Sequence, residues 1–123
     1  MLYSSVIRER FRNPRFVGEL ADADATFEDV NPLCGDRVRM QLRFADGGIT
    51  DARFKGDSCA ICTASADILA EMVRGRSFTE IVALGPDDLL GRLGARIRPS
   101  RMTCVTLPLQ VLKGALASTG AAR

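Results

Sequence analysis

The segment 37–44 alternates strictly between apolar and polar residues, and this pattern restricts the fold more than any other feature of the chain. Its apolar members lie two residues apart and are Val38, Met40, Leu42 and Phe44. A period of two is typical of a strand with one buried face. Asp46-Gly47-Gly48 follows and is typical of a hairpin turn, so we expect an antiparallel partner strand over Ile49–Lys55. A weaker strand is expected over Thr26–Val30.

After the hairpin the spacing of apolar residues becomes helical. Apolar residues three and four apart predict a helix over Ala60–Arg74, with Gly75 as its C-cap. Ser77-Phe78-Thr79-Glu80 has the spacing of a capping box and predicts a short helix to Leu84. Gly85-Pro86 then predicts the start of another helix, because proline is tolerated in a first turn.

Two further helices are expected near the ends of the chain. Tyr3–Arg12 reads as an amphipathic helix ended by Asn13-Pro14, and its predicted apolar face consists of Tyr3, Val6, Ile7 and Phe11. The last helix contains Pro108, which we expect in the first turn because proline farther inside would break the hydrogen-bond ladder. Cys104 is therefore expected at or just before the start of that helix.

Composition favours one compact domain over residues 1–123, since 46% of the residues are hydrophobic and no linker-like stretch interrupts them. No apolar run is long enough for a membrane span, and the first residues become charged too early for a secretory signal. We therefore expect a cytoplasmic protein. The net charge of +2 is too small to indicate a nucleic-acid or membrane partner.

Four cysteines and no histidine point to thiolate chemistry. Free thiols persist in a reducing compartment, so an even cysteine count there favours metal binding or redox chemistry over disulfides. Cys34 lies in a turn, and Cys59 and Cys104 are expected at helix N-termini. Unpaired backbone N–H groups at such positions stabilise an anion, so we expect a lowered pKa for the Cys59 and Cys104 thiols.

One carboxylate is expected beside these thiols. Gly35 in the turn Pro32-Leu33-Cys34-Gly35-Asp36 lets the chain curl so that Cys34 and Asp36 face one point. Three thiolates and the Asp36 carboxylate predict a tetrahedral metal site, although Gly-Asp is also ordinary turn chemistry. Without an imidazole, ligand sets and general bases that use histidine are excluded.

Cys62 leaves three interpretations open. It lies one helical turn after Cys59 and could reach the same point as an alternate ligand. It also borders the apolar stripe of its helix, where it would be an inert core thiol. The spacing Cys59-Ala60-Ile61-Cys62 further permits a redox dithiol at a helix start.

Taken together, the motifs resemble those of the U-type iron–sulfur scaffolds, the family of IscU, SufU and the N-terminal domain of NifU. The resemblance is colinear over nearly the whole chain. It rests on Asn13-Pro14-Arg15 with Gly18, Pro32-x-Cys34-Gly35-Asp36, Ala52-Arg53-Phe54-Lys55-Gly56-x-x-Cys59, Ala64-Ser65, Gly75-Arg76-Ser77 and Arg101-x-x-Cys104-x-x-Leu107. It implies an α+β fold in which a small antiparallel three-stranded sheet packs against helices.

The same resemblance implies a function. A transient [2Fe–2S] cluster would be assembled on Cys34, Cys59 and Cys104, with Asp36 tuning its lability. A cysteine desulfurase would supply persulfide sulfur and acceptor apoproteins would receive the cluster, so the chain would be a scaffold and not an enzyme. The alternative is a SufU-like sulfurtransferase partner, in which the same four residues hold Zn²⁺ and Cys104 is the candidate persulfide acceptor.

The chain departs from the family pattern in several places. Thr103 stands where IscU members carry histidine, and residues 97–101 match only partly the Leu-Pro-Pro-Val-Lys segment that their dedicated chaperone recognises. The sequence therefore gives little reason to expect that chaperone as a partner. The histidine-free site and the Arg101 motif resemble SufU more closely, but the chain lacks the insertion that SufU carries before its last helix. Cys62 stands where relatives generally have serine or another small residue.

Overall fold

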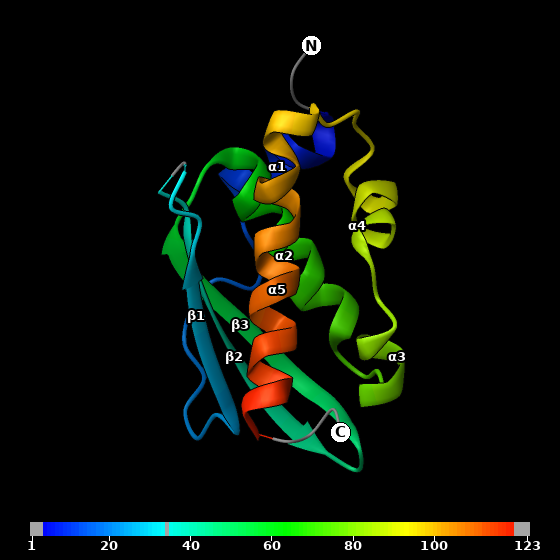
Figure 1. Ribbon diagram of the computed structural model, residues 1–123. Coiled ribbons are helices and arrows are strands. Elements are labelled where there is room, and N and C mark those ends of the chain that lie inside the picture. Colours follow the sequence, from blue (N-terminus) through cyan, green and yellow to red (C-terminus); the bar gives the residue numbers. More distant parts are fainter. Residues whose placement is uncertain (1–3, 34, 120–123) are drawn as a thin grey trace.

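The structure is a computed structural model that describes residues 4–33 and 35–119. One antiparallel sheet has the strand order β1-β2-β3, with β1 at Ala25–Val30, β2 at Arg37–Ala45 and β3 at Gly48–Asp57. The helices are α1 (Ser5–Arg12), α2 (Ala60–Val73), α3 (Phe78–Val82), α4 (Pro86–Leu93), the short 3-10 helix η1 (Pro99–Arg101) and α5 (Met102–Thr119). Helices α2 and α5 lie on one face of the sheet, as Figure 1 shows. The predicted α+β fold is confirmed.

The sheet follows the sequence pattern closely. Val38, Met40 and Leu42 are at most 1% exposed, whereas the polar residues that alternate with them lie on the other face of β2. The turn at residues 46 and 47 joins β2 to β3, and β1 pairs antiparallel with β2. All three predicted strands are therefore confirmed, with small shifts of their ends.

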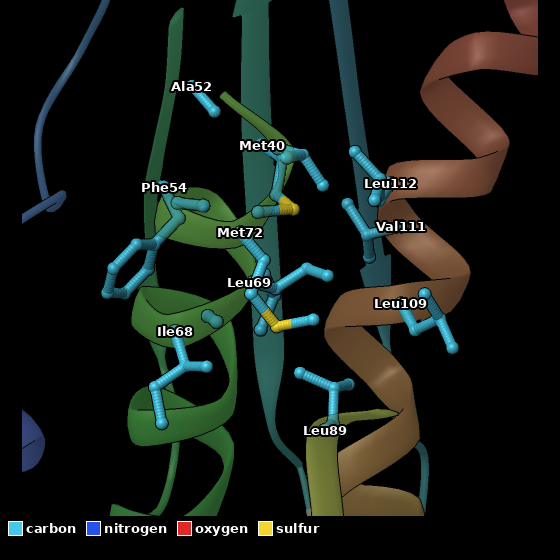
Figure 2. Packing of buried hydrophobic residues seen from close by; sticks show 14 of the residues in the cluster. Met40, Ala52, Phe54, Ile68, Leu69, Met72, Leu89, Leu109, Val111 and Leu112 are labelled. Carbon is cyan, nitrogen blue, oxygen red and sulfur yellow. The ribbon is translucent and has the colours of Figure 1, made fainter. Parts of the chain in front are cut away.

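The core fills the space between the sheet and the two long helices. Met40 of β2, Leu69 of α2 and Leu112 of α5 point into this space, as Figure 2 shows. Helix α5 approaches the sheet so closely that a Cβ on Gly114 would lie 2.6 Å from the Phe27 ring. The absence of a side chain at position 114 thus allows α5 to pack against β1.

Among the described residues, no helix combines the length and the apolar character that crossing a bilayer requires. The capping box at Ser77 and Glu80 is present at the start of α3, and α4 begins at Pro86, as predicted. Helix α2 ends at Val73 and its C-cap is Arg74, one residue before the predicted Gly75, which follows with a left-handed φ of +82°.

The expected position of Pro108 is wrong, because this residue lies inside α5 and not in its first turn. A proline there removes one helix hydrogen bond, which costs about 3 kcal/mol. The preceding turn stays helical because it buries Val105 and Leu107, and each such side chain contributes about 1.5–3 kcal/mol. In addition, the Ser65 hydroxyl of α2 donates a hydrogen bond of 2.8 Å to the Val105 carbonyl. Tertiary packing therefore outweighs the local helix rule.

The apolar face predicted for α1 is also wrong in part. Phe11 is 50% exposed, whereas Arg10 is buried against α2; Tyr3 lies outside the described residues. The cause is Asp67, a fully buried carboxylate of α2 whose Oδ2 lies 2.8 Å from Arg10 Nη1. Its other oxygen accepts hydrogen bonds from the backbone N–H groups of residues 15 and 16. The buried charge thus selects which face of α1 turns inward.

Replacing Asp67 with alanine should lower the free energy of unfolding by about 3–5 kcal/mol, because the buried Arg10 would lose its buried partner and two backbone N–H groups would lose their acceptor. Glu71→Ala is the control, since Glu71 also pairs with Arg10 but is partly exposed. Its loss should be clearly smaller. Urea unfolding followed by circular dichroism measures both, and equal losses would contradict the role given to Asp67.

Candidate metal centre

Three segments that are distant in the sequence meet at one end of the molecule. Asp36 lies in the turn between β1 and β2, Cys59 is the N-cap of α2 and Cys104 lies in the first turn of α5. Figure 1 shows this turn and the starts of both helices at the same end. One ligand atom from each residue lies within 4.8 Å of the other two. The structure thus brings together three predicted ligands, while Cys34 lies outside the described residues.

The turn before β2 holds Asp36 in place. Gly35 adopts a left-handed φ of +77°, and the Asn31 backbone accepts from the N–H of Gly35 and donates to the carbonyl of Asp36. Asp36 is only 7% exposed, and its Oδ1 accepts a 3.0 Å hydrogen bond from the Cys59 backbone N–H. This bond connects the turn directly to the start of α2.

The second oxygen of Asp36 is buried and has no hydrogen-bond partner among the described residues. Burying a carboxylate oxygen without a partner is costly, so native proteins rarely leave one unsatisfied. Two thiols lie within 4.8 Å of this carboxylate. A carboxylate oxygen and soft sulfur atoms together form a donor set that fits zinc or iron.

The two described thiols of this group differ in exposure. Cys59 is half-buried, and its Sγ accepts a 3.4 Å hydrogen bond from the Cys62 backbone N–H. Cys104 is only 2% exposed. Burial raises the pKa of Cys104 to about 12, and a hydrogen bond from Arg101 offsets this only in part. The predicted lowering of the Cys104 pKa is therefore wrong, because desolvation outweighs the helix N-terminus.

Arg101 is a site residue that the sequence analysis named only as part of the Arg101-x-x-Cys104-x-x-Leu107 motif, without a role at the site. It lies at the end of η1, and its side chain hydrogen-bonds the thiols of Cys104 and Cys59. These contacts raise the pKa of the Arg101 guanidinium above its ordinary value. The available signal was its position three residues before Cys104, since residues three apart share a helix face. Arg101 brings a positive charge to a site built from anionic ligands.

Cys62 lies beneath this group. Its side chain is fully buried in the hydrophobic core, and its thiol hydrogen-bonds the Ser58 side chain. Burial raises the pKa of the Cys62 thiol well above its usual range, and the nearby charges of Asp36, Cys59 and Cys104 raise it further. Among the described residues, the group within 4.8 Å consists of Asp36, Cys59 and Cys104. The alternate-ligand role of Cys62 stays a prediction.

Residues 2–121 match the family model of the NifU-like N-terminal domain. The chain belongs to this family. The match covers almost the entire sequence, so it includes every residue of the candidate metal centre. The resemblance seen in the cysteine motifs is thereby confirmed.

Curated relatives and solved structures agree with this assignment. The chain is 33% identical to the iron–sulfur cluster assembly scaffold protein IscU of Escherichia coli (strain K12), covering 95% of this chain and 93% of the relative. It is 30% identical to the zinc-dependent sulfurtransferase SufU of Bacillus subtilis (strain 168), covering 94% and 90%. A crystal structure of a scaffold-protein candidate for the SUF system of Fervidobacterium islandicum AW-1 superposes with a TM-score of 0.80 at 25% identity, covering 93% of this chain and 96% of that chain.

Arg101→Gln should weaken zinc binding by about 10–100-fold, the range typical for partners that orient metal ligands. The variant loses the guanidinium that lowers the pKa of Cys104, and a metal must displace the thiol proton. Competition with a chromophoric chelator at fixed pH measures the affinity. Arg98→Gln, an exposed position in the same segment, is the matched control and should bind like the parent. Equal affinities in all three proteins would show that Arg101 does not act on the thiols.

Proposed function

We propose that this chain is a scaffold on which an iron–sulfur cluster is assembled and from which it passes to acceptor proteins. The observation that carries the proposal is the buried Asp36 carboxylate, which lies beside two thiols and whose Oδ2 has no hydrogen-bond partner within the described part of the chain. Membership in the NifU-like N-terminal domain family supports it, as does the similarity to an IscU scaffold protein. Sulfur would come from a cysteine desulfurase in the reducing cytoplasm, where we place this chain.

The site residues would have different roles in such a scaffold. Cys59, Cys104 and, as proposed from the sequence, Cys34 supply thiolates for a [2Fe–2S] cluster. Asp36 supplies a harder oxygen ligand that holds soft iron–sulfur centres less firmly than a thiolate does. Arg101 offsets part of the negative charge of these ligands, which lowers the cost of gathering them in a buried site.

A second candidate is a zinc-dependent acceptor of persulfide sulfur, in which the same four residues hold Zn²⁺. The histidine-free ligand set favours it, together with the similarity to a relative named as a zinc-dependent sulfurtransferase. Cys104 is the proposed acceptor in this case. Since Cys104 is only 2% exposed, docking of the desulfurase would have to uncover its thiol before sulfur transfer.

Metal and acid-labile sulfide analysis separates the two candidates. The protein is isolated without oxygen and without chelator, and iron, zinc and sulfide are measured per chain. Iron with matching sulfide supports the scaffold, whereas zinc without sulfide supports the persulfide acceptor. Failure to retain either metal at a stoichiometric level would contradict both candidates.

The three proposed cluster thiolates should each be required for cluster assembly. Cys34→Ala, Cys59→Ala and Cys104→Ala should lose the visible iron–sulfur absorption after reconstitution with iron and inorganic sulfide, because each removes a thiolate ligand. Cys62→Ser is the matched control and should keep it. A loss in Cys62→Ser as large as in the alanine variants would make Cys62 a ligand, and parent-like spectra at all three alanine positions would refute the site.

Asp36→Ala should lengthen the lifetime of a bound cluster, because it removes the weakly held oxygen that promotes exchange. The decay of the visible absorption under chelator challenge measures the lifetime. Asp57→Ala changes an exposed carboxylate at the end of β3 and should leave the lifetime unchanged. If Asp36→Ala also decays like the parent, Asp36 serves only the turn.

A further inference from the structure

The metal centre leaves the Cys62 thiol without a role, although it is the closest cysteine in sequence to Cys59. The two residues form a C-x-x-C pair, with Cys59 as the N-cap of α2 and Cys62 at the end of the first turn. The Cys62 backbone N–H lies 3.4 Å from Cys59 Sγ and donates to it. The Cys59 sulfur therefore folds back over the first turn, toward Cys62.

The orientation of the Cys62 side chain supports this pairing. Its thiol hydrogen-bonds the side chain of Ser58, the residue directly before Cys59. Ser58 is itself anchored to the first turn of α2, because its hydroxyl lies 2.8 Å from that of Thr63. The Cys62 side chain, although fully buried, thus lies close to the Ser58–Cys59 segment.

The Cys59 and Cys62 thiols differ in their accessibility to a sulfur donor. Cys59 is the most accessible of the three thiols that the structure describes, since Cys62 and Cys104 are both buried. A bulky sulfur donor can therefore approach Cys59 but not Cys62. An accessible thiol with a second cysteine directly beside it is the arrangement in which the second thiol can resolve a covalent adduct on the first.

We propose that Cys62 is a resolving thiol, which attacks a persulfide on Cys59 and releases sulfide; this rests on the proposed function. The Cys62 sulfur forms a disulfide with Cys59 Sγ, and the bond between Cys59 Sγ and the outer sulfur breaks. The outer sulfur leaves as HS⁻ and takes up the proton that Cys62 loses. It gains two electrons, which the two cysteines supply by becoming a disulfide.

This step would meet a chemical need of the scaffold. Desulfurase sulfur arrives at the oxidation level of a persulfide, whereas a cluster contains sulfide. The Cys59–Cys62 pair would provide the two electrons inside the chain. A dithiol reductant must then restore both thiols, after which Cys59 is again free to bind iron.

Persulfide resolution can be tested on the metal-free full-length chain. Reduced protein is treated with inorganic polysulfide, desalted, and followed for sulfide release, alkylation and tryptic peptides. Cys59 and Cys62 share the peptide 56–74, whereas Cys34 and Cys104 lie in peptides 16–37 and 102–113. We expect sulfide release to coincide with a peptide 56–74 that is two hydrogens lighter and resists alkylation.

Two variants at position 62 complete the test. Cys62→Ser and Cys62→Ala should keep the persulfide on Cys59 and release sulfide about tenfold more slowly, because an intramolecular step is lost. Circular dichroism and thermal unfolding check that both are folded, and using two replacements guards against a packing defect in one. Parent-like release from folded variants would overturn the proposal. So would a disulfide linking peptide 56–74 to peptide 102–113 or 16–37.

This outcome is independent of the scaffold proposal. Metal retention and reconstitution with inorganic sulfide do not require persulfide chemistry, so they can succeed when resolution fails. Conversely, the protein could retain no metal and still form a Cys59–Cys62 disulfide with release of sulfide. That outcome would reject the scaffold proposal and support the resolving role of Cys62.

Discussion

Helices α2 and α5 pack side by side on the sheet and begin at the same end of the molecule, and the candidate metal centre depends on this arrangement. The Ser65 hydroxyl binds the Val105 carbonyl and fixes the first turn of α5 against α2. A second bond, from the Cys59 N–H to Asp36, ties the turn before β2 to the start of α2. Cys104 is brought to the other two residues by packing alone, since no local sequence rule connects positions 59 and 104.

Two of the aspartates that the structure describes, Asp36 and Asp67, are buried, and their surroundings differ in an informative way. Asp67 has a partner for both oxygens, Arg10 on one side and two backbone N–H groups on the other. Among the residues that the structure describes, Asp36 has a partner for Oδ1 only. A buried carboxylate whose two oxygens are both hydrogen-bonded serves to hold helices together. A buried carboxylate with one oxygen left unbonded beside thiols can use that oxygen to bind a ligand. The contrast separates a structural carboxylate from a functional one within a single fold.

The three thiols that the structure describes differ in how deeply they are buried, and this difference gives them different chemistry. Cys59 is half-buried and reachable, Cys104 is nearly buried beside Arg101, and Cys62 is enclosed in the core. Burial makes a neutral thiol more stable than a thiolate, so a positive group or a metal is needed to deprotonate Cys104. The guanidinium of Arg101 is a positive group that meets this need for Cys104 in part.

The sequence alone determined the strands, the hairpin, the helix caps and the candidate ligands, because these depend on local periodicity, turn chemistry and short motifs. The ligand role of Cys34 still rests on the sequence. Contacts between distant segments decided the rest. Asp67 selected the inward face of α1, the packing of α5 against α2 and the sheet kept Pro108 inside a helix, and burial reversed the expected pKa shift of Cys104. Such effects depend on desolvation and on partners far away in the chain, which only the tertiary structure specifies.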